Sequence, residues 1–125
     1  MNRHQLREKC MTCLYQHCLI GKDINEASID VFGGAVQKLN LFEKDLLQNT
    51  MDHKERYIQY INETLDEWTF DRLGYLEQAI LLLACSEFDQ KQTQSAIIID
   101  EAINLAKAYC DEDSYKLING VLDSL

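Results

Sequence analysis

Three residues near the start of the chain have the types and spacing of a metal site. Cys10, Cys13 and His17 lie at relative positions 0, 3 and 7, so one face of a helix would carry two thiols and an imidazole. These groups bind zinc, but a structural zinc ion takes four ligands and no fourth one fits this pattern. Free cysteine also packs as a small apolar residue. Two hypotheses therefore stay open here, a metal-binding helical protein and a buried helix face without metal or cofactor.

The outward side of the same predicted helix carries two cations and an aromatic ring. Arg3 and Arg7 are one turn apart, and Tyr15 lies two turns further along a neighbouring stripe. A guanidinium group binds phosphate through paired hydrogen bonds, and a tyrosine ring can stack on an unpaired base. The pattern suits single-stranded RNA, although an ordinary solvated helix face would look similar.

Nothing in the sequence has the pattern of a catalytic site. The three histidines, His4, His17 and His53, all lie in the first half, and none has a recognisable nucleophile and acid beside it. There is no glycine-rich phosphate loop and no paired His-Glu metal motif. We therefore expect a protein that works by binding and not an enzyme.

The elements that position these residues are predicted to be helices. The 125 residues include no proline, and the apolar fraction of 46% is typical of a globular protein. Residues 1–125 are expected to form a single domain with an all-α fold, a compact helical bundle. Apolar residues recur at helical spacing over residues 3–19, 42–49, 57–65, 71–85, 95–107 and 113–125. Residues 23–39 are only loosely periodic.

Several residues predict where these helices begin, end and pack. Gly21 is expected to end the first helix, and Ser95 to cap the fifth. Either Asp113 or Ser114 is expected to cap the last helix, in which Gly120 would allow a neighbouring backbone to approach closely. The fourth helix is apolar on all sides from residue 79 to 85, which places it in the middle of the bundle.

Charge and composition limit the partners and the compartment. The formal charge of −9 argues against nonspecific nucleic-acid binding, and only the N-terminal residues carry an excess of cations. No apolar run approaches the roughly 20 residues that span a bilayer, and the N-terminus does not resemble a signal peptide. We expect a cytoplasmic protein without membrane contact, whose five cysteines are reduced.

Three segments of the C-terminal third of the chain stand out together, and they are Ile99–Lys107, Glu112–Lys116 and Ile118–Asp123. In their order and spacing they resemble the NusB family of transcription antitermination factors. Upstream segments similar to the family's central and first helices are Trp68–Leu73, Glu77–Leu81 with Glu87, Leu6–Glu8 and Leu14–Gln16. The resemblance covers nearly the whole chain and is weakest over residues 20–50.

The resemblance implies a bundle of about seven helices in two subdomains of three to four helices each. It also implies a factor that binds boxA-type single-stranded RNA together with the ribosomal protein NusE. Such a factor acts indirectly on the RNA polymerase elongation complex during rRNA synthesis, as a monomer or a homodimer. A NusB-type adaptor that binds proteins but has lost strong RNA binding is the first alternative, and the metal-binding protein described above is the second.

The resemblance also assigns residues to the two partners. The RNA-binding positions it implies are Arg3, His4, Arg7 and Tyr15 in the first helix, and Asp113, Lys116 and Leu117 around the start of the last. The position implied for NusE contact is Glu77. Because the RNA positions lie in the first and last helices, we expect the two ends of the chain to meet in space. The family's first helix usually opens with a denser run of arginines, so RNA affinity is expected to be low without NusE.

Overall fold

The computed structural model describes all 125 residues and contains six α-helices, two single turns of 3-10 helix and no strand. The α-helices are α1 (Arg3–Ile20), α2 (Ile24–Phe32), α3 (Leu41–Thr64), α4 (Tyr75–Gln90), α5 (Ser95–Tyr109) and α6 (Glu112–Ser124). The 3-10 turns are η1 (Val36–Lys38) and η2 (Phe70–Arg72). The predicted all-α bundle is confirmed, with six helices in place of about seven.

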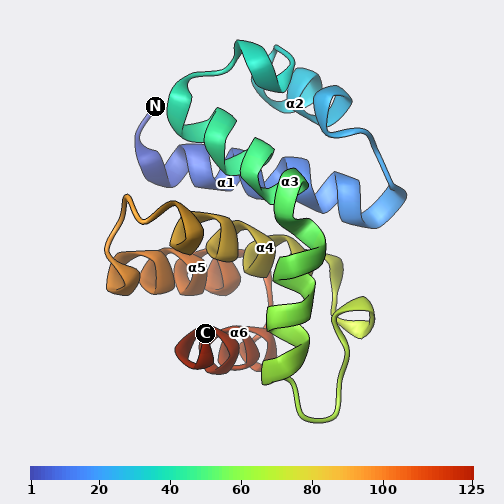
Figure 1. Ribbon diagram of the computed structural model, residues 1–125, viewed down its shortest axis with the longest axis vertical. Coiled ribbons are helices and arrows are strands. Elements are labelled where there is room, and N and C mark those ends of the chain that lie inside the picture. Colours follow the sequence, from blue (N-terminus) through green and yellow to red (C-terminus); the bar gives the residue numbers. More distant parts are fainter.

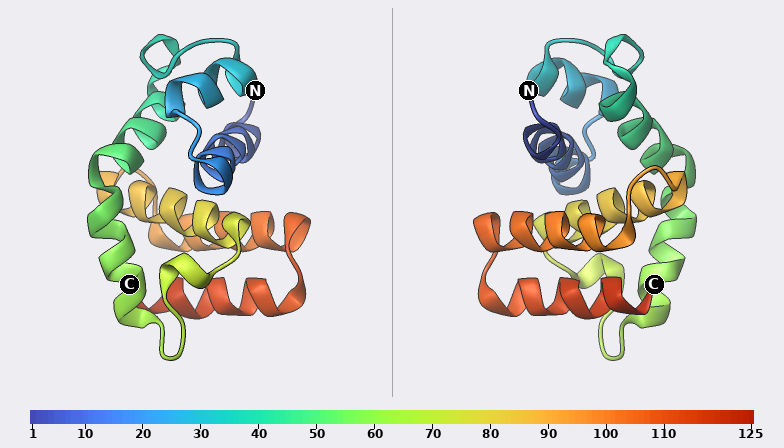
Figure 2. Two further views of the ribbon diagram at one scale, coloured as in Figure 1. Left: turned by 90° about the vertical axis from the view of Figure 1, so that its right-hand side faces the viewer. Right: turned by 90° about the vertical axis from the view of Figure 1, so that its left-hand side faces the viewer.

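Four of the helices lie one above another, in the order α1, α4, α5 and α6 (Figure 1). The side views in Figure 2 show α1 and α6 on opposite sides of the α4 and α5 layers, with α2 against α1 at the far end. The expectation that the first and last helices meet was therefore wrong. It failed because α4 and α5 form a hairpin that fills the space between them.

Helix α3 connects the two parts of the bundle. Two separate helices were predicted over this region, and α3 indeed consists of two helical segments, which join without a loop at a kink where His53 is not helical (φ −123°, ψ 17°). The first half of α3 contacts α4 through Leu46, whose carbonyl accepts a hydrogen bond of 3.0 Å from Ser86. The second half contacts the end of α4 through Tyr57, whose hydroxyl donates to Asp89 at 2.7 Å. Between these contacts the residues of α3 are mostly polar, so apolar spacing did not reveal that the two helical segments join directly.

Helix α4 is the centre of the core, as predicted. Every residue from Gln78 to Glu87 is buried, because α1, α3, α5 and α6 all pack against it. Its leucines belong to a cluster of 26 buried apolar residues, and burying one leucine side chain contributes about 1.5–3 kcal/mol. Only the two ends of α4 reach the surface. None of the six helices combines the length and the apolar content that crossing a bilayer would require.

The two glycine predictions had opposite outcomes. Gly21 follows α1 in a left-handed conformation (φ 68°) and donates its N–H to the carbonyl of His17, so it ends the helix as predicted. Gly120 was expected to lie against a neighbouring backbone, and this was wrong. It is exposed within α6, and a β-carbon added there would meet no atom within 4 Å.

The N-caps of the last two helices each lie one or more residues before the predicted position. Helix α5 is preceded by Gln94, whose side chain makes no capping bond, and Ser95 is already helical. Helix α6 is capped by Asp111, whose Oδ1 accepts a 2.8 Å hydrogen bond from the Ser114 N–H. That bond lowers the pKa of the Asp111 carboxyl. The prediction failed because Asp111 and Asp113 are equally suitable cap residues two positions apart.

Candidate nucleic-acid interface

Arg7 does not lie on the outward side of α1, contrary to the prediction, but is buried with 5% of its surface exposed. Its Nε donates to Oε1 of Glu87 at 2.8 Å, and its Nη2 donates to Oε2 at 2.6 Å. Its Nη1 lies 3.8 Å from Oε2 of Glu101. The hydrogen bonds to Glu87 raise the pKa of Arg7. Carboxylates thus lie against N–H groups on more than one edge of the guanidinium, through Nε and Nη2 to Glu87 and Nη1 to Glu101.

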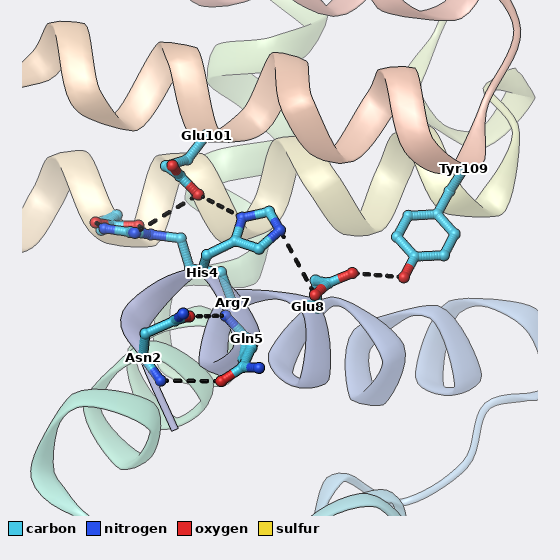
Figure 3. A network of polar contacts seen from close by, with 8 residues as sticks. Asn2, His4, Gln5, Arg7, Glu8, Glu101 and Tyr109 are labelled. Atoms are coloured by element: carbon cyan, nitrogen blue, oxygen red, sulfur yellow. Dashed lines mark hydrogen bonds and ion pairs between the residues drawn. The ribbon is translucent and has the colours of Figure 1, made fainter.

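A chain of polar contacts continues from this pair across the surface between α1 and α5 (Figure 3). The imidazole of His4 lies between two carboxylates, with Nδ1 2.9 Å from Oε2 of Glu101 and Nε2 3.5 Å from Oε1 of Glu8. The other oxygen of Glu8 accepts a 2.6 Å hydrogen bond from the Tyr109 hydroxyl, which raises the pKa of Tyr109. These contacts hold the first two turns of α1 against α5. Neither Glu101 nor Tyr109 could be recognised as a partner from the sequence, because they lie 97 residues from His4 and 101 residues from Glu8, respectively.

Arg3 is the exposed cation of the first helical turn. Its guanidinium carbon lies 4.3 Å from the centroid of the Phe42 ring, which belongs to the first turn of α3. Stacking on an aromatic face restrains the side chain while leaving the N–H edge of the guanidinium free. Arg3 can therefore offer paired donors to a phosphate without first being ordered.

A shallow groove of about 400 Å³ runs along α1 beside the polar chain. It is lined by Gln5, Lys9, Thr12 and Tyr109, together with Met1 and Glu8. Tyr109 is half exposed, so its ring is accessible for stacking. The sequence prediction missed both Lys9 and Tyr109. The exposed aromatic residue just before the acidic turn into α6 was the one available signal for Tyr109.

The other predicted RNA-binding residues are placed less favourably. Tyr15 and Leu117 are half buried and pack against the core. Asp113 is exposed in the first turn of α6, and Lys116 pairs with Glu112 at 3.0 Å on the same exposed face. The first turn of α6 is therefore acidic, which disfavours contact with phosphate.

Glu77, predicted to contact NusE, lies in the first turn of α4. Its Oε1 accepts a 2.7 Å hydrogen bond from the backbone N–H of Gly74, so it helps to begin the helix. The carboxylate is half buried at one of the two ends of α4 that reach the surface. A structural role in capping is thus visible, and partner contact stays a prediction.

The residues proposed as metal ligands do not come together. Cys10 and Cys13 are fully buried at 0% exposure, and burial raises the pKa of the Cys10 thiol well above its usual value and that of Cys13 to about 12. The His17 ring points elsewhere, with Nδ1 2.8 Å from the Lys22 carbonyl and Nε2 3.1 Å from the Lys54 ammonium. Nowhere in the chain do three His, Cys, Asp or Glu side chains gather in a way that could hold a metal ion. The metal-binding hypothesis was therefore wrong.

Comparison with known proteins identifies the family. The model of the NusB family matches residues 4–125. The chain belongs to the NusB family. The transcription antitermination protein NusB of a Sulfurovum species is 36% identical over 125 residues, which cover 98% of this chain and 96% of that protein. The resemblance drawn from the sequence is thus confirmed.

Solved structures of the family agree with the fold. NusB of T. maritima superimposes with a TM-score of 0.84 at 25% identity, over 98% of this chain and 89% of that one. A chain from a crystal structure of the antitermination factors NusB and NusE in complex with dsRNA gives a TM-score of 0.83 at 27% identity. That match covers 98% of this chain and 96% of the other. The helical architecture described above is therefore the NusB fold over nearly its full length.

Proposed function

We propose that this protein is a transcription antitermination factor that binds boxA-type single-stranded RNA together with the ribosomal protein NusE. Through that assembly it would act indirectly on the RNA polymerase elongation complex during rRNA synthesis. The observation that carries the proposal is the match, over 98% of the chain, to the fold found in a complex of NusB and NusE with dsRNA. The protein would work in the cytoplasm by binding alone, without enzymatic activity.

The RNA surface is assigned to the start of α1 and the groove beside it. Arg3 is exposed and held on Phe42, so it is the proposed phosphate contact. Lys9 and Tyr109 line the neighbouring groove and supply a second cation and an accessible ring. His4 lies between this groove and Glu101 and can contact RNA only at its exposed edge.

Arg7 is assigned a positioning role. Its guanidinium donates two hydrogen bonds to Glu87 and lies close to Glu101, so a paired contact with RNA through the same donors would require it to leave a buried ion pair. Breaking such a pair leaves an uncompensated charge in the interior, at a cost of about 3–5 kcal/mol. By holding α1 against α4, Arg7 instead fixes the place from which Arg3 projects.

Contact with NusE is assigned to the exposed N-terminal end of α4 at Glu77. The middle of α4 is covered by other helices and is not available to a partner. The formal charge of −9 suits a basic ribosomal protein, because opposite charges favour encounter and orientation.

The adaptor alternative is kept because the structure leaves few cations free for RNA. Arg7 is buried in an ion pair, Lys116 pairs with Glu112, and the first turn of α6 is acidic. An adaptor would form a NusE complex of normal strength to which RNA adds nothing.

One titration distinguishes the two functions. Fluorescently labelled boxA-type single-stranded RNA is titrated with the purified protein, with NusE, and with both, at low and moderate salt. The antitermination proposal predicts binding that is tightest with both proteins and weakens as salt increases. A stable complex of the two proteins with no gain in RNA affinity over NusE alone would contradict it and favour the adaptor. A duplex of the same sequence serves as the comparison ligand.

A further inference from the structure

A second and larger groove, of about 930 Å³, lies between the second half of α3 and the ends of three other helices. Its walls come from α3, the end of α4, the start of α5 and the end of α6. Figure 1 shows the second half of α3 beside the end of α6, on the side of the α4 and α5 layers away from α1. This groove shares no lining residue with the groove along α1.

The walls of the groove are partly apolar and accessible. Tyr60 on α3 is 43% exposed and Leu125 at the end of α6 is 46% exposed, and Phe88 and Ile99 contribute apolar surface from α4 and α5. A space of this size bordered by aromatic and aliphatic side chains can take one or more apolar side chains of a ligand. The walls therefore favour a ligand with an apolar anchor.

The rim of the groove is acidic. Glu63, Asp89 and Asp123 line it against a single lysine, Lys91. Asp89 is already engaged by the Tyr57 hydroxyl and the Arg56 guanidinium. Glu63 and Asp123, by contrast, make no side-chain hydrogen bond or ion pair within the protein, so both carboxylates are free to pair with a cationic ligand.

Backbone dipoles reinforce this charge. Three helices end at the groove, α3 at Thr64, α4 just before Lys91 and α6 at Ser124, whereas only α5 begins there, at Ser95. Each helix C-terminus carries unpaired carbonyls equivalent to about half a negative charge. The ends of the helices thus add to the carboxylates, and a phosphate-bearing ligand would be repelled.

We propose that this groove docks a short segment of a protein partner in which an apolar side chain is flanked by lysine or arginine. The apolar side chain fills the space between Tyr60 and Leu125, and the basic residues pair with Glu63 and Asp123. The site does not depend on RNA binding by α1, because the two grooves lie on different parts of the molecule.

Peptide titrations with the full-length protein test the chemistry of the ligand. The probe is a labelled, end-blocked ten-residue peptide of leucine and lysine, with two comparison peptides in which either the leucines become serine or the lysines become glutamate. The proposal predicts binding of the leucine–lysine peptide and about tenfold or greater loss for both comparison peptides. Equal binding of the serine–lysine peptide, or displacement of the probe by spermidine, would overturn it.

Matched variants test the location. Asp123→Lys should lower the affinity for the leucine–lysine peptide about tenfold, because it replaces an attractive charge with a repulsive one. The charge-matched control is Glu26→Lys on exposed α2, which should leave the affinity unchanged. Tyr60→Ser should also weaken binding, whereas Tyr75→Ser, which alters an equally exposed tyrosine (44%) outside the groove, should not. Equal effects of Asp123→Lys and Glu26→Lys, or no effect of Tyr60→Ser, would show nonspecific attraction and refute the site.

Discussion

Arg7 near the start of α1 and Glu87 near the end of α4, 80 residues apart in the chain, form a buried ion pair with two hydrogen bonds. This pair joins the first helix to the central one directly beneath the proposed RNA surface. Its effect on function is therefore expected to be indirect, through the position of α1.

Arg7→Ala should lower the free energy of unfolding by about 3–5 kcal/mol, because it leaves Glu87 as an unpaired buried charge. Combining Arg7→Met with Glu87→Leu should recover most of that loss, since two apolar side chains of similar volume replace the pair. Urea unfolding followed by circular dichroism measures both effects.

The same double variant separates the two possible roles of Arg7. If Arg7 only positions α1, the folded Arg7→Met, Glu87→Leu protein should keep nearly all of its RNA affinity in the presence of NusE. A folded double variant that binds RNA as weakly as Arg3→Ala would instead show that Arg7 contacts the RNA.

Alkaline pH should destabilise the protein through its buried thiols. Burial raises the pKa of Cys13 from 9.0 to about 12, so the folded protein keeps a proton that the unfolded chain releases as pH rises through 9. The free energy of unfolding therefore keeps this contribution below pH 9. Above pH 9 it falls by up to about 1.4 kcal/mol per pH unit for each such thiol. Urea unfolding at pH 7 and pH 10 measures the slope. Cys13→Ala should have a lower free energy of unfolding at pH 7 and should lose less of it between pH 7 and pH 10. A decrease with pH equal to that of the unaltered protein would contradict this explanation.

Gly120→Ala should raise the free energy of unfolding by about 0.5–1 kcal/mol. Gly120 lies within α6 with open space around it, and alanine is the better helix former. Gly21→Ala is the matched control and should lower the free energy of unfolding, because the left-handed φ of 68° at this position strains a residue with a β-carbon. Thermal unfolding of both variants checks the pair, and destabilisation by Gly120→Ala would show that α6 packs differently.

Local patterns predicted the helices and their buried faces well. The apolar spacing over residues 3–19 predicted a helix with a buried face, and Cys10, Cys13 and Leu14 on α1 are fully buried, while the apolar run in α4 is the centre of the core. These features depend on apolar spacing within one helix, which the sequence displays directly. The single domain over residues 1–125 stays a prediction, supported by the one cluster of buried residues that spans the helices.

Contacts between distant segments could not be read from the sequence in the same way. Arg7 has the spacing of an exposed residue paired with Arg3, and only the approach of Glu87 in the fold makes its burial favourable. The polar middle of α3 likewise gave no apolar signal, so the direct junction of its two helical segments at His53 was not predicted. Of the two arginines predicted on the outward side of the first helix, Arg3 is exposed as expected and Arg7 is turned inward, and an RNA site on this helix stays a prediction.

The RNA affinity of Arg3→Ala, compared with Arg72→Ala in the presence of NusE, tests the central claim most directly. Both arginines are exposed and lie over an aromatic ring, Arg3 on Phe42 and Arg72 on Trp68, so the two variants lose the same charge and a similar contact. Arg3→Ala should weaken boxA-type RNA about tenfold and reduce the salt dependence by about one released ion, whereas Arg72→Ala should bind like the unaltered protein. Equal affinities for the two variants would contradict an RNA site at the start of α1.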